Sequence, residues 1–274
     1  MHEIETSGQE DLYSLSILVG TGECNAYCKH CGGVPLRKYA PKEDGIIDRD
    51  LFEKILRECY DRGARYLSIS GCGEPTLSPA SVTATMDLVH MLAEEGIAYT
   101  PVNLYSNGIR IGNDSDFSNT YLGCWRQLGL TSVYLSVHDI DEARNAAGYG
   151  VTRYPKLENI LSRIHDAGLL VRINLILSKE NTPTCDDFTR MISALREMGA
   201  DTISAWPIRG LNDLISPELA PSEQELGRMA EWVMRNEDPN FKIRLLIEKG
   251  HDSYAKRKKL TLFPDGKLAS FWCN

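Results

Sequence analysis

The sequence lacks long apolar runs. Its longest apolar stretches, such as Leu15 to Val19 and Leu245 to Ile247, fall far short of the roughly 20 residues that a membrane-spanning helix needs. Residues 1–12 are acidic and polar, without the basic start and apolar core of a secretory signal. Hydrophobic residues nevertheless make up 42% of the chain, the ordinary share for a folded protein. We therefore expect a folded cytoplasmic protein with no membrane partner.

The chain also lacks an excess of positive charge. Lys and Arg number 30 against 38 Asp and Glu, which gives a formal net charge of −8. Binding to a nucleic-acid backbone depends on clustered Lys and Arg, so this balance argues against a nucleic-acid partner and favours a neutral or cationic substrate. The one basic run, residues 256–259, is short and is typical of a solvated surface.

Cysteine is scarce except in one segment. The chain has 8 Cys, below the density of a disulfide-stapled protein, and three of them form a CxxxCxxC motif: Cys24, Cys28 and Cys31. A zinc site completed by His30 or another His is one interpretation, but structural zinc ligands usually come as two separated pairs and no second pair occurs. Three thiolates can instead hold three irons of a cubic cluster, whose fourth iron then keeps an open position.

Apolar, β-prone segments alternate with helical patterns along most of the chain, which predicts an α/β fold. The predicted strands are residues 15–19, 65–70, 100–105, 132–137, 172–177 and 202–206, and the helices are 50–61, 81–95, 116–128, 157–167 and 186–198. Six βα repeats fall short of the eight of a closed barrel, so we predict a partial, open (β/α)6 TIM-like barrel.

The rest of the chain differs in character from these repeats. Residues 1–11 form an acidic N-terminal lead, residues 12–210 the core barrel, and residues 211–274 a short α/β extension that ends in a hairpin. We predict for this extension a helix at 222–236, a strand at 241–247 and hairpin arms at 260–263 and 267–271. Since chemistry on such barrels takes place at the carboxyl ends of the strands, we expect the extension to cover the barrel mouth.

The cysteine motif resembles the signature of the radical S-adenosylmethionine (SAM) superfamily, CxxxCxΦC, with His30 in the place of the aromatic residue. The resemblance implies a single [4Fe-4S] cluster on the three cysteines, with SAM bound to the open iron, and an electron donor such as flavodoxin or ferredoxin. In that family, reductive cleavage of SAM yields a 5'-deoxyadenosyl radical, which removes a hydrogen atom from the substrate. The cofactor supplies this chemistry, and the protein orients the reacting atoms and excludes water.

Further matches to the family lie at the ends of the predicted strands. The segment SGCGEP at 70–75 looks like the family's GGEP motif, with Cys72 in place of its first Gly, and YSNG at 105–108 resembles a TNG-like segment. By this resemblance and by their places at strand ends, the residues expected to bind SAM are His30, Gly73, Glu74, Ser106, Asn107, Ser136, Arg172, Asn174 and Trp206. A serine that caps a local turn, an outward-facing Arg172 and a Trp206 packed in the core are the alternatives.

Cys273 follows the predicted hairpin, one residue before the sequence ends. A similar hairpin in larger relatives supplies the first ligand of an auxiliary cluster, and such a cluster here would have to recruit Cys72, Cys124 or Cys185. We predict instead that Cys273 faces the substrate as a hydrogen-atom donor. A cysteine that simply packs beside Trp272 is the alternative.

The predicted function is that of a radical SAM enzyme that epimerises a small polar metabolite, such as an aminosugar, or a peptide. Its layout resembles the neomycin C epimerase type, in which a thiol quenches the substrate radical. The alternatives are a radical SAM dehydrogenase or carbon-skeleton enzyme, and an enzyme that modifies tRNA or activates a glycyl-radical partner. A non-enzymatic iron-sulfur or zinc-binding module is the alternative from another class.

Overall fold

The protein folds around one curved sheet. The computed structural model describes residues 12–210, 214–247 and 259–270, and in these residues the sheet has nine strands in the order β7-β6-β5-β4-β3-β2-β1-β8-β9. Neighbouring strands are parallel except for the β8–β9 pair, which is antiparallel. The strands are β1 (Ser14–Val19), β2 (Tyr66–Gly71), β3 (Val102–Ser106), β4 (Ser132–Val137), β5 (Leu170–Leu177), β6 (Thr202–Pro207), β7 (Lys242–Leu245), β8 (Lys259–Leu262) and β9 (Leu268–Ala269).

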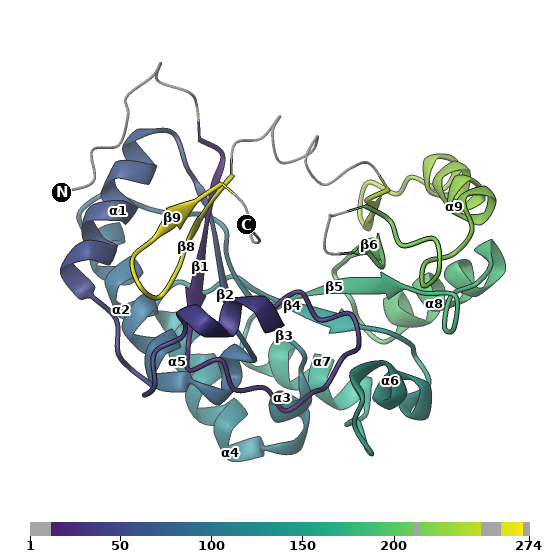
Figure 1. Cartoon of the computed structure of the whole chain (residues 1–274), viewed down its shortest axis with the longest axis horizontal. Helices are drawn as coiled ribbons and strands as arrows, with labels where there is room; N and C mark the ends of the chain where they lie inside the picture. Colours follow the sequence, from purple (N-terminus) through teal and green to yellow (C-terminus); the bar gives the residue numbers. More distant parts are fainter. Residues whose placement is uncertain (1–11, 211–213, 248–258, 271–274) are drawn as a thin grey trace.

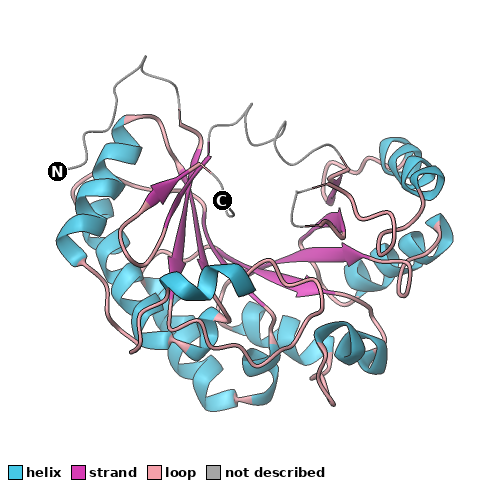
Figure 2. Ribbon diagram, viewed as in Figure 1, coloured by secondary structure: helices cyan, strands magenta, loops and turns pink. Residues whose placement is uncertain are grey.

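The helices lie on the outer side of the curved sheet and leave its concave face open (Figures 1 and 2). They are α1 (Arg49–Asp61), α2 (Pro79–Glu94), α3 (Ile109–Asn113), α4 (Ser115–Phe117), α5 (Gly123–Gln127), α6 (Glu142–Tyr149), α7 (Leu157–Asp166), α8 (Cys185–Glu197) and α9 (Glu223–Arg235). Short 3-10 turns cover Val34–Tyr39 and Pro75–Leu77, and a π-helical turn at Ser118–Leu122 joins α4 to α5. None of the helices in the described ranges has the length and apolar character that crossing a membrane requires.

The apolar core lies between the outer face of the sheet and the helices. In β5 the even and odd positions differ: Val171, Ile173 and Leu175 are fully buried in this core, while Arg172 and Asn174 are only partly buried. Because successive side chains of a strand point to opposite faces, the two polar residues lie on the concave face. The alternative of an outward-facing Arg172 is therefore wrong.

The partial barrel predicted from the sequence is confirmed, and the nine strands of the described residues do not close into a ring. All six predicted core strands are present as β1 to β6, but the single helix expected at 116–128 is divided into α4, a π-helical turn and α5. Helices α3 and α6 were not predicted from the sequence. Strands of the predicted extension join the same sheet, β7 beside β6 and β8 beside β1, while the division of the chain into domains stays a prediction.

One side of the concave face is filled by apolar side chains. A second cluster, separate from the main core, consists of Leu18, Leu36, Cys72 and Phe263, and the ring of Phe263 meets that of Tyr39 edge-on at 5.0 Å between centroids. These residues come from β1, the turn after the cysteine motif, the β2 loop and the β8–β9 turn. On β4, β5 and β6, by contrast, concave-face residues such as Ser136, Asn174 and Ser204 are only partly buried, and we call this region the open part of the concave face.

Candidate active site

The CxxxCxxC motif lies on the loop that follows β1, at the carboxyl end of the parallel strands. We call residues 22–31 of this loop the cysteine loop. Its three thiols are partly buried, and burial, together with negative charge on Cys31 and Cys24, raises the pKa of Cys28 to about 12. Burial is also the main cause of the raised pKa of Cys24. The three sulfurs are close enough to repel one another as anions, and a bound cationic metal centre would remove that penalty.

The donor set of this loop fits an iron-sulfur cluster. Among the described residues, no three His, Cys, Asp or Glu side chains converge in the way that ligands of a single metal ion do. A cubic cluster takes one thiolate for each of three irons, so its ligands need not meet at one point. Three partly buried cysteines on one loop suit that arrangement.

Gly73 brings the β2 loop into direct contact with the start of the cysteine loop. A Cβ atom at Gly73 would lie 2.1 Å from the carbonyl oxygen of Glu23 and 2.5 Å from that of Gly22, and the Glu74 amide donates to the Glu23 carbonyl at 2.8 Å. Only glycine allows this approach of two backbones. Gly73 thus makes a close approach to the protein's own backbone, and its predicted contact with SAM stays a prediction.

Glu74 is buried beneath the same loops, with 5% of its surface exposed. One carboxylate oxygen accepts from the Ser106 hydroxyl at 2.8 Å and from the Thr76 hydroxyl at 2.7 Å and amide at 3.1 Å, and the other accepts from the Asn107 amide at 2.8 Å. Burial raises the pKa of Glu74, while the hydrogen bonds act in the opposite direction. The carboxylate joins the β2 and β3 loops, a role that the sequence did not reveal, and its contact with the SAM amino group stays a prediction.

Asn107 connects the β3 loop to the cysteine loop. Its Nδ2 donates to Asn25 Oδ1 at 2.7 Å and lies 3.9 Å from Cys24 Sγ, while its backbone carbonyl accepts from the Tyr154 hydroxyl at 2.7 Å. A donor beside a cysteine sulfur is a feature that tunes iron-sulfur clusters. The predicted site residue Asn107 is therefore placed against the candidate cluster ligands.

His30 starts a chain of ring contacts across the site. Its ring lies 5.1 Å from that of His138, which lies 4.6 Å from Tyr149, and Tyr149 stacks on Tyr154 at 5.0 Å. Burial lowers the pKa of His30, and burial with the charge of His30 lowers that of His138 to about 3. The His138 imidazole is thus held neutral at neutral pH. The cysteine loop is further tied to α6 by the Tyr27 amide, which donates to the Tyr149 carbonyl at 2.8 Å.

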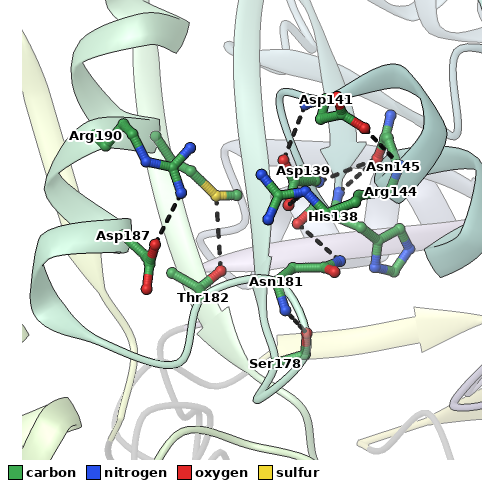
Figure 3. A network of polar contacts seen from close by, with 11 residues as sticks. His138, Asp139, Asp141, Arg144, Asn145, Ser178, Asn181, Thr182, Asp187 and Arg190 are labelled. Carbon is green, nitrogen blue, oxygen red and sulfur yellow. Dashed lines mark hydrogen bonds and ion pairs between the residues drawn. The ribbon is translucent and has the colours of Figure 1, made fainter.

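The end of β4 is fixed by a polar network, shown in Figure 3. The backbone amide of His138 donates to Asn145 Oδ1 at 2.8 Å, and its carbonyl accepts from Asn181 Nδ2 at 3.2 Å. The neighbouring Asp139 side chain is fully buried, with Arg144 Nε at 3.3 Å, and burial raises its pKa. This network was not predicted from the sequence, where the one available signal was a carboxylate two residues after a predicted strand.

The four remaining predicted SAM ligands share the concave face of β4, β5 and β6. Ser136 pairs in register with Asn174, and Trp206 pairs with Ile176 one step nearer the barrel mouth. Arg172 lies one step deeper, where its Nη1 donates to the Tyr134 hydroxyl at 3.1 Å. The structure brings Ser136, Asn174 and Trp206 to the open part of the concave face, all partly buried, and contact with SAM stays a prediction for each.

The other cysteines are dispersed. All seven cysteines in the described ranges are free: Cys59 is buried in α1, Cys72 is buried in the second apolar cluster, Cys124 is exposed on α5, and Cys185 begins α8. Cys273 lies outside the described residues, so the roles predicted for it as donor or packing residue stay predictions.

Among curated proteins, the chain is similar to bacterial GTP 3',8-cyclases. It is 26% identical to that of Actinobacillus succinogenes over 162 residues, 58% of this chain and 44% of the relative. It is 27% identical to that of Edwardsiella ictaluri over 173 residues, 61% of this chain and 47% of the relative. The chain thus spans about half the length of the curated relatives it matches. No protein-family model matches it.

Among solved structures, the fold is similar to that of Streptococcus suis SuiB bound to S-adenosylmethionine, with a TM-score of 0.66 and 15% identity, covering 95% of this chain and 60% of that one. It is also similar to anSMEcpe with bound AdoMet, with a TM-score of 0.62 and 14% identity, covering 94% of this chain and 74% of that one. A radical SAM methyltransferase from Sphaerobacter thermophilus matches with a TM-score of 0.58 and 14% identity, over 94% of this chain and 70% of that one.

Proposed function

Because the chain belongs to the radical SAM superfamily, whose cofactors are a [4Fe-4S] cluster and SAM, we propose that it holds the cluster on the cysteine loop and removes a hydrogen atom from a substrate. The observation that carries the proposal is the way the cysteine loop is docked on the strand ends. The β2 loop contacts it through Gly73 and the β3 loop through Asn107. When bound, the cluster and SAM supply the radical that starts the reaction.

The protein's own part is to bind and orient. We place the amino-acid end of SAM beside the loops that Glu74 joins, and its ribose and adenine along Ser136, Asn174 and Trp206. These side chains supply hydroxyl, amide and aromatic groups on the open part of the concave face, which suits a ligand that is polar at one end and flat at the other. The apolar cluster around Leu18 fills the opposite side of the barrel and keeps water from that part of the site.

Anaerobic reconstitution with iron and sulfide tests this proposal. The protein should bind about four irons per chain and form 5'-deoxyadenosine from SAM in the presence of a reductant. The triple variant C24A/C28A/C31A should fold but lose both properties completely, because thiolates are the only protein bonds to the iron. The control is C124A, which removes an exposed cysteine on α5. A comparable cluster in the triple variant would contradict the assignment.

For the reaction we propose epimerisation, with Cys273 as the second hydrogen donor. The substrate C–H bond breaks and its hydrogen atom ends on 5'-deoxyadenosine. The Cys273 S–H bond then breaks, its hydrogen atom forms a new C–H bond on the opposite face of the substrate carbon, and one electron and one proton from outside restore the thiol. A flavodoxin or ferredoxin is the proposed electron source, and the substrate is a small polar molecule or a peptide. SuiB, solved with its precursor peptide SuiA, supports the inclusion of peptides.

Replacing Cys273 distinguishes epimerisation from the alternatives. In deuterated water the wild-type product should carry deuterium at the inverted carbon, and C273A should still cleave SAM but give no inverted product. Unchanged turnover and deuterium content in C273A would remove the donor role of Cys273, whereas a wild-type product changed in oxidation state or bonding would favour a dehydrogenase or carbon-skeleton enzyme. A cytoplasmic location and the lack of a nucleic-acid partner stay predictions.

A further inference from the structure

The charged side chains of the sheet are all of one sign. In the described strands, β1 to β9, no Asp or Glu occurs, and the charged residues are Arg172, Lys242, Arg244 and Lys259. The whole chain has a net charge of −8, so this is a local reversal. Charges of one sign on a barrel wall focus the field on the ligands inside it.

Three of these cations share one region of the concave face. Arg172 pairs in register with Thr202, and Thr202 with Lys242; on the next step, Asn174 pairs with Ser204, and Ser204 with Arg244. Residues paired in register on parallel strands point to the same side, and neighbouring strands lie about 4.8 Å apart. Arg172, Lys242 and Arg244, which we call the cationic face, therefore border one patch that contains the small polar side chains of β6.

Arg172 is set up to receive a further partner. Its guanidinium lies 5.5 Å from the centroid of the Tyr134 ring, which itself stacks on Tyr105 at 4.7 Å. Its Nη1 donates to the Tyr134 hydroxyl, but its buried Nε has no hydrogen-bond partner among the described residues. A buried donor without a partner costs free energy, and a guanidinium fixed by a bond to a tyrosine hydroxyl presents its remaining donors in the planar array that fits an oxyanion.

The edge position of β7 accounts for only part of this charge. Lys and Arg on an exposed edge strand protect a sheet against pairing with another chain, and Lys242 and Arg244 are exposed. Arg172, however, lies two strands inside that edge and is partly buried. Protection of the edge does not explain a cation at that place.

We infer that the cationic face binds a phosphate or diphosphate group of the substrate. The inference rests on the proposed function, since it names the substrate class for the same barrel. It moves Arg172 from SAM to the substrate and reverses the expectation, drawn from the net charge, of a neutral or cationic ligand. Arg172 and Lys242 lie two strands, or about 10 Å, apart, so one carboxylate cannot reach both, whereas a diphosphate with several negative charges can lie between them.

Calorimetric titration of the reconstituted full-length protein with inorganic pyrophosphate, in low salt to limit screening, tests the inference. Wild type should bind with one-site saturation. R172Q should bind pyrophosphate at least about 10-fold more weakly than wild type, because it loses one charged hydrogen bond. K242Q/R244Q should also bind pyrophosphate more weakly. The matched control K54Q/R235Q removes two exposed cations from helices α1 and α9 and should bind as wild type does.

The outcomes separate the inference from the proposed function. Cluster formation and SAM cleavage are measured on the same samples. Their absence in wild type overturns the proposed function, while the pyrophosphate titration still decides whether the cationic face binds phosphate groups. The inference is overturned if wild type does not saturate, if citrate competes as well as pyrophosphate, or if the control loses as much affinity as K242Q/R244Q. A fall in SAM affinity in R172Q, with pyrophosphate binding intact, would instead assign Arg172 to SAM.

Discussion

Tyr154 donates a hydrogen bond of 2.7 Å to the backbone carbonyl of Asn107, and so holds the residue whose side chain reaches Asn25 in the cysteine loop. Both Tyr154 and Asn107 are buried. The support of the candidate cluster site therefore extends beyond the loops that carry the sequence motifs, to a tyrosine between α6 and α7.

Replacing Tyr154 with Phe should destabilise the protein by about 1 to 2 kcal/mol, because the buried Asn107 carbonyl loses its donor. Iron content after reconstitution should fall with it, since the Asn107 side chain is then less well fixed. Urea unfolding and iron analysis measure the two effects. Tyr27→Phe removes a hydroxyl from a ring that is 77% exposed and should change neither; equal behaviour of the two variants would show that the bond does not support the loop.

Removing the Glu74 carboxylate should have a larger effect. In Glu74→Ala, donors from Thr76, Ser106 and Asn107 lose their acceptor in a buried place, and we expect a loss of about 3 to 5 kcal/mol in unfolding free energy. Glu94→Ala removes a carboxylate whose side chain is 71% exposed and should cost little.

The Glu74 result also separates two roles for the carboxylate. Because its oxygens are already bonded within the protein, the loss of stability should be seen before SAM is added. A variant with the stability of wild type and a reduced affinity for SAM would show that Glu74 acts only on the cofactor. Glu74→Gln keeps the volume of the side chain but directs an NH2 group at one of its donors. Its unfolding free energy should therefore lie between those of wild type and Glu74→Ala.

Adding one methyl group at Gly73 should separate the β2 loop from the cysteine loop. The new Cβ would lie 2.1 Å from a backbone oxygen of Glu23, so Gly73→Ala should cost about 1 to 3 kcal/mol or more and lower the iron content. The matched control is Gly32→Ala, next to Cys31, where a Cβ meets nothing within 4 Å. Full cluster loading in Gly73→Ala would mean that the contact is dispensable.

The sequence predicted the core strands because their signal is local. Apolar and β-branched runs bounded by glycine mark β1 to β6 whatever surrounds them, and the cysteine motif marks the site for the same reason. Helix α6 was missed because its sequence, EARNAAGY, has a weak apolar pattern. It is held by contacts made elsewhere, such as the bond from the Tyr149 hydroxyl to the Ser136 carbonyl at 2.6 Å.

The roles of Glu74 and Arg172 depend on residues far away in the chain. The sequence places a carboxylate after β2, but its donors Ser106 and Asn107 lie at the end of β3, more than thirty residues later. Alternation along the strand puts Arg172 on the same side as Asn174, yet only the register of the sheet brings Tyr134 beside Arg172 and places Lys242 two strands away on the same face. The alternation of residues along a strand predicts which face of the sheet a side chain lies on. The pairing of strands determines which other side chains lie beside it there.

Protonation of His138 should limit the stability of the protein in acid. Its pKa is lowered to about 3, against about 6.5 in an unfolded chain, because the buried ring between His30 and Tyr149 cannot take up charge without a desolvation cost. A lowered pKa means that the unfolded chain binds the extra proton first. The stabilisation is therefore complete above pH 6.5 and is lost as the pH falls from 6.5 toward 3.

His138→Phe removes this dependence, since a phenyl ring fills the place without titrating. Between pH 7 and pH 5 the free energy of unfolding of wild type should fall by about 2 kcal/mol more than that of the variant, from 1.36 kcal/mol per pH unit over about 1.5 units. Urea unfolding should be followed on protein without added iron, because metal binding by cysteine is itself pH-dependent. His90→Gln, which removes a partly exposed imidazole on α2, is the control for the loss of a histidine. Parallel curves for wild type and His138→Phe would mean that the His138 ring reaches water when protonated, and that the contact between His30 and His138 opens in acid.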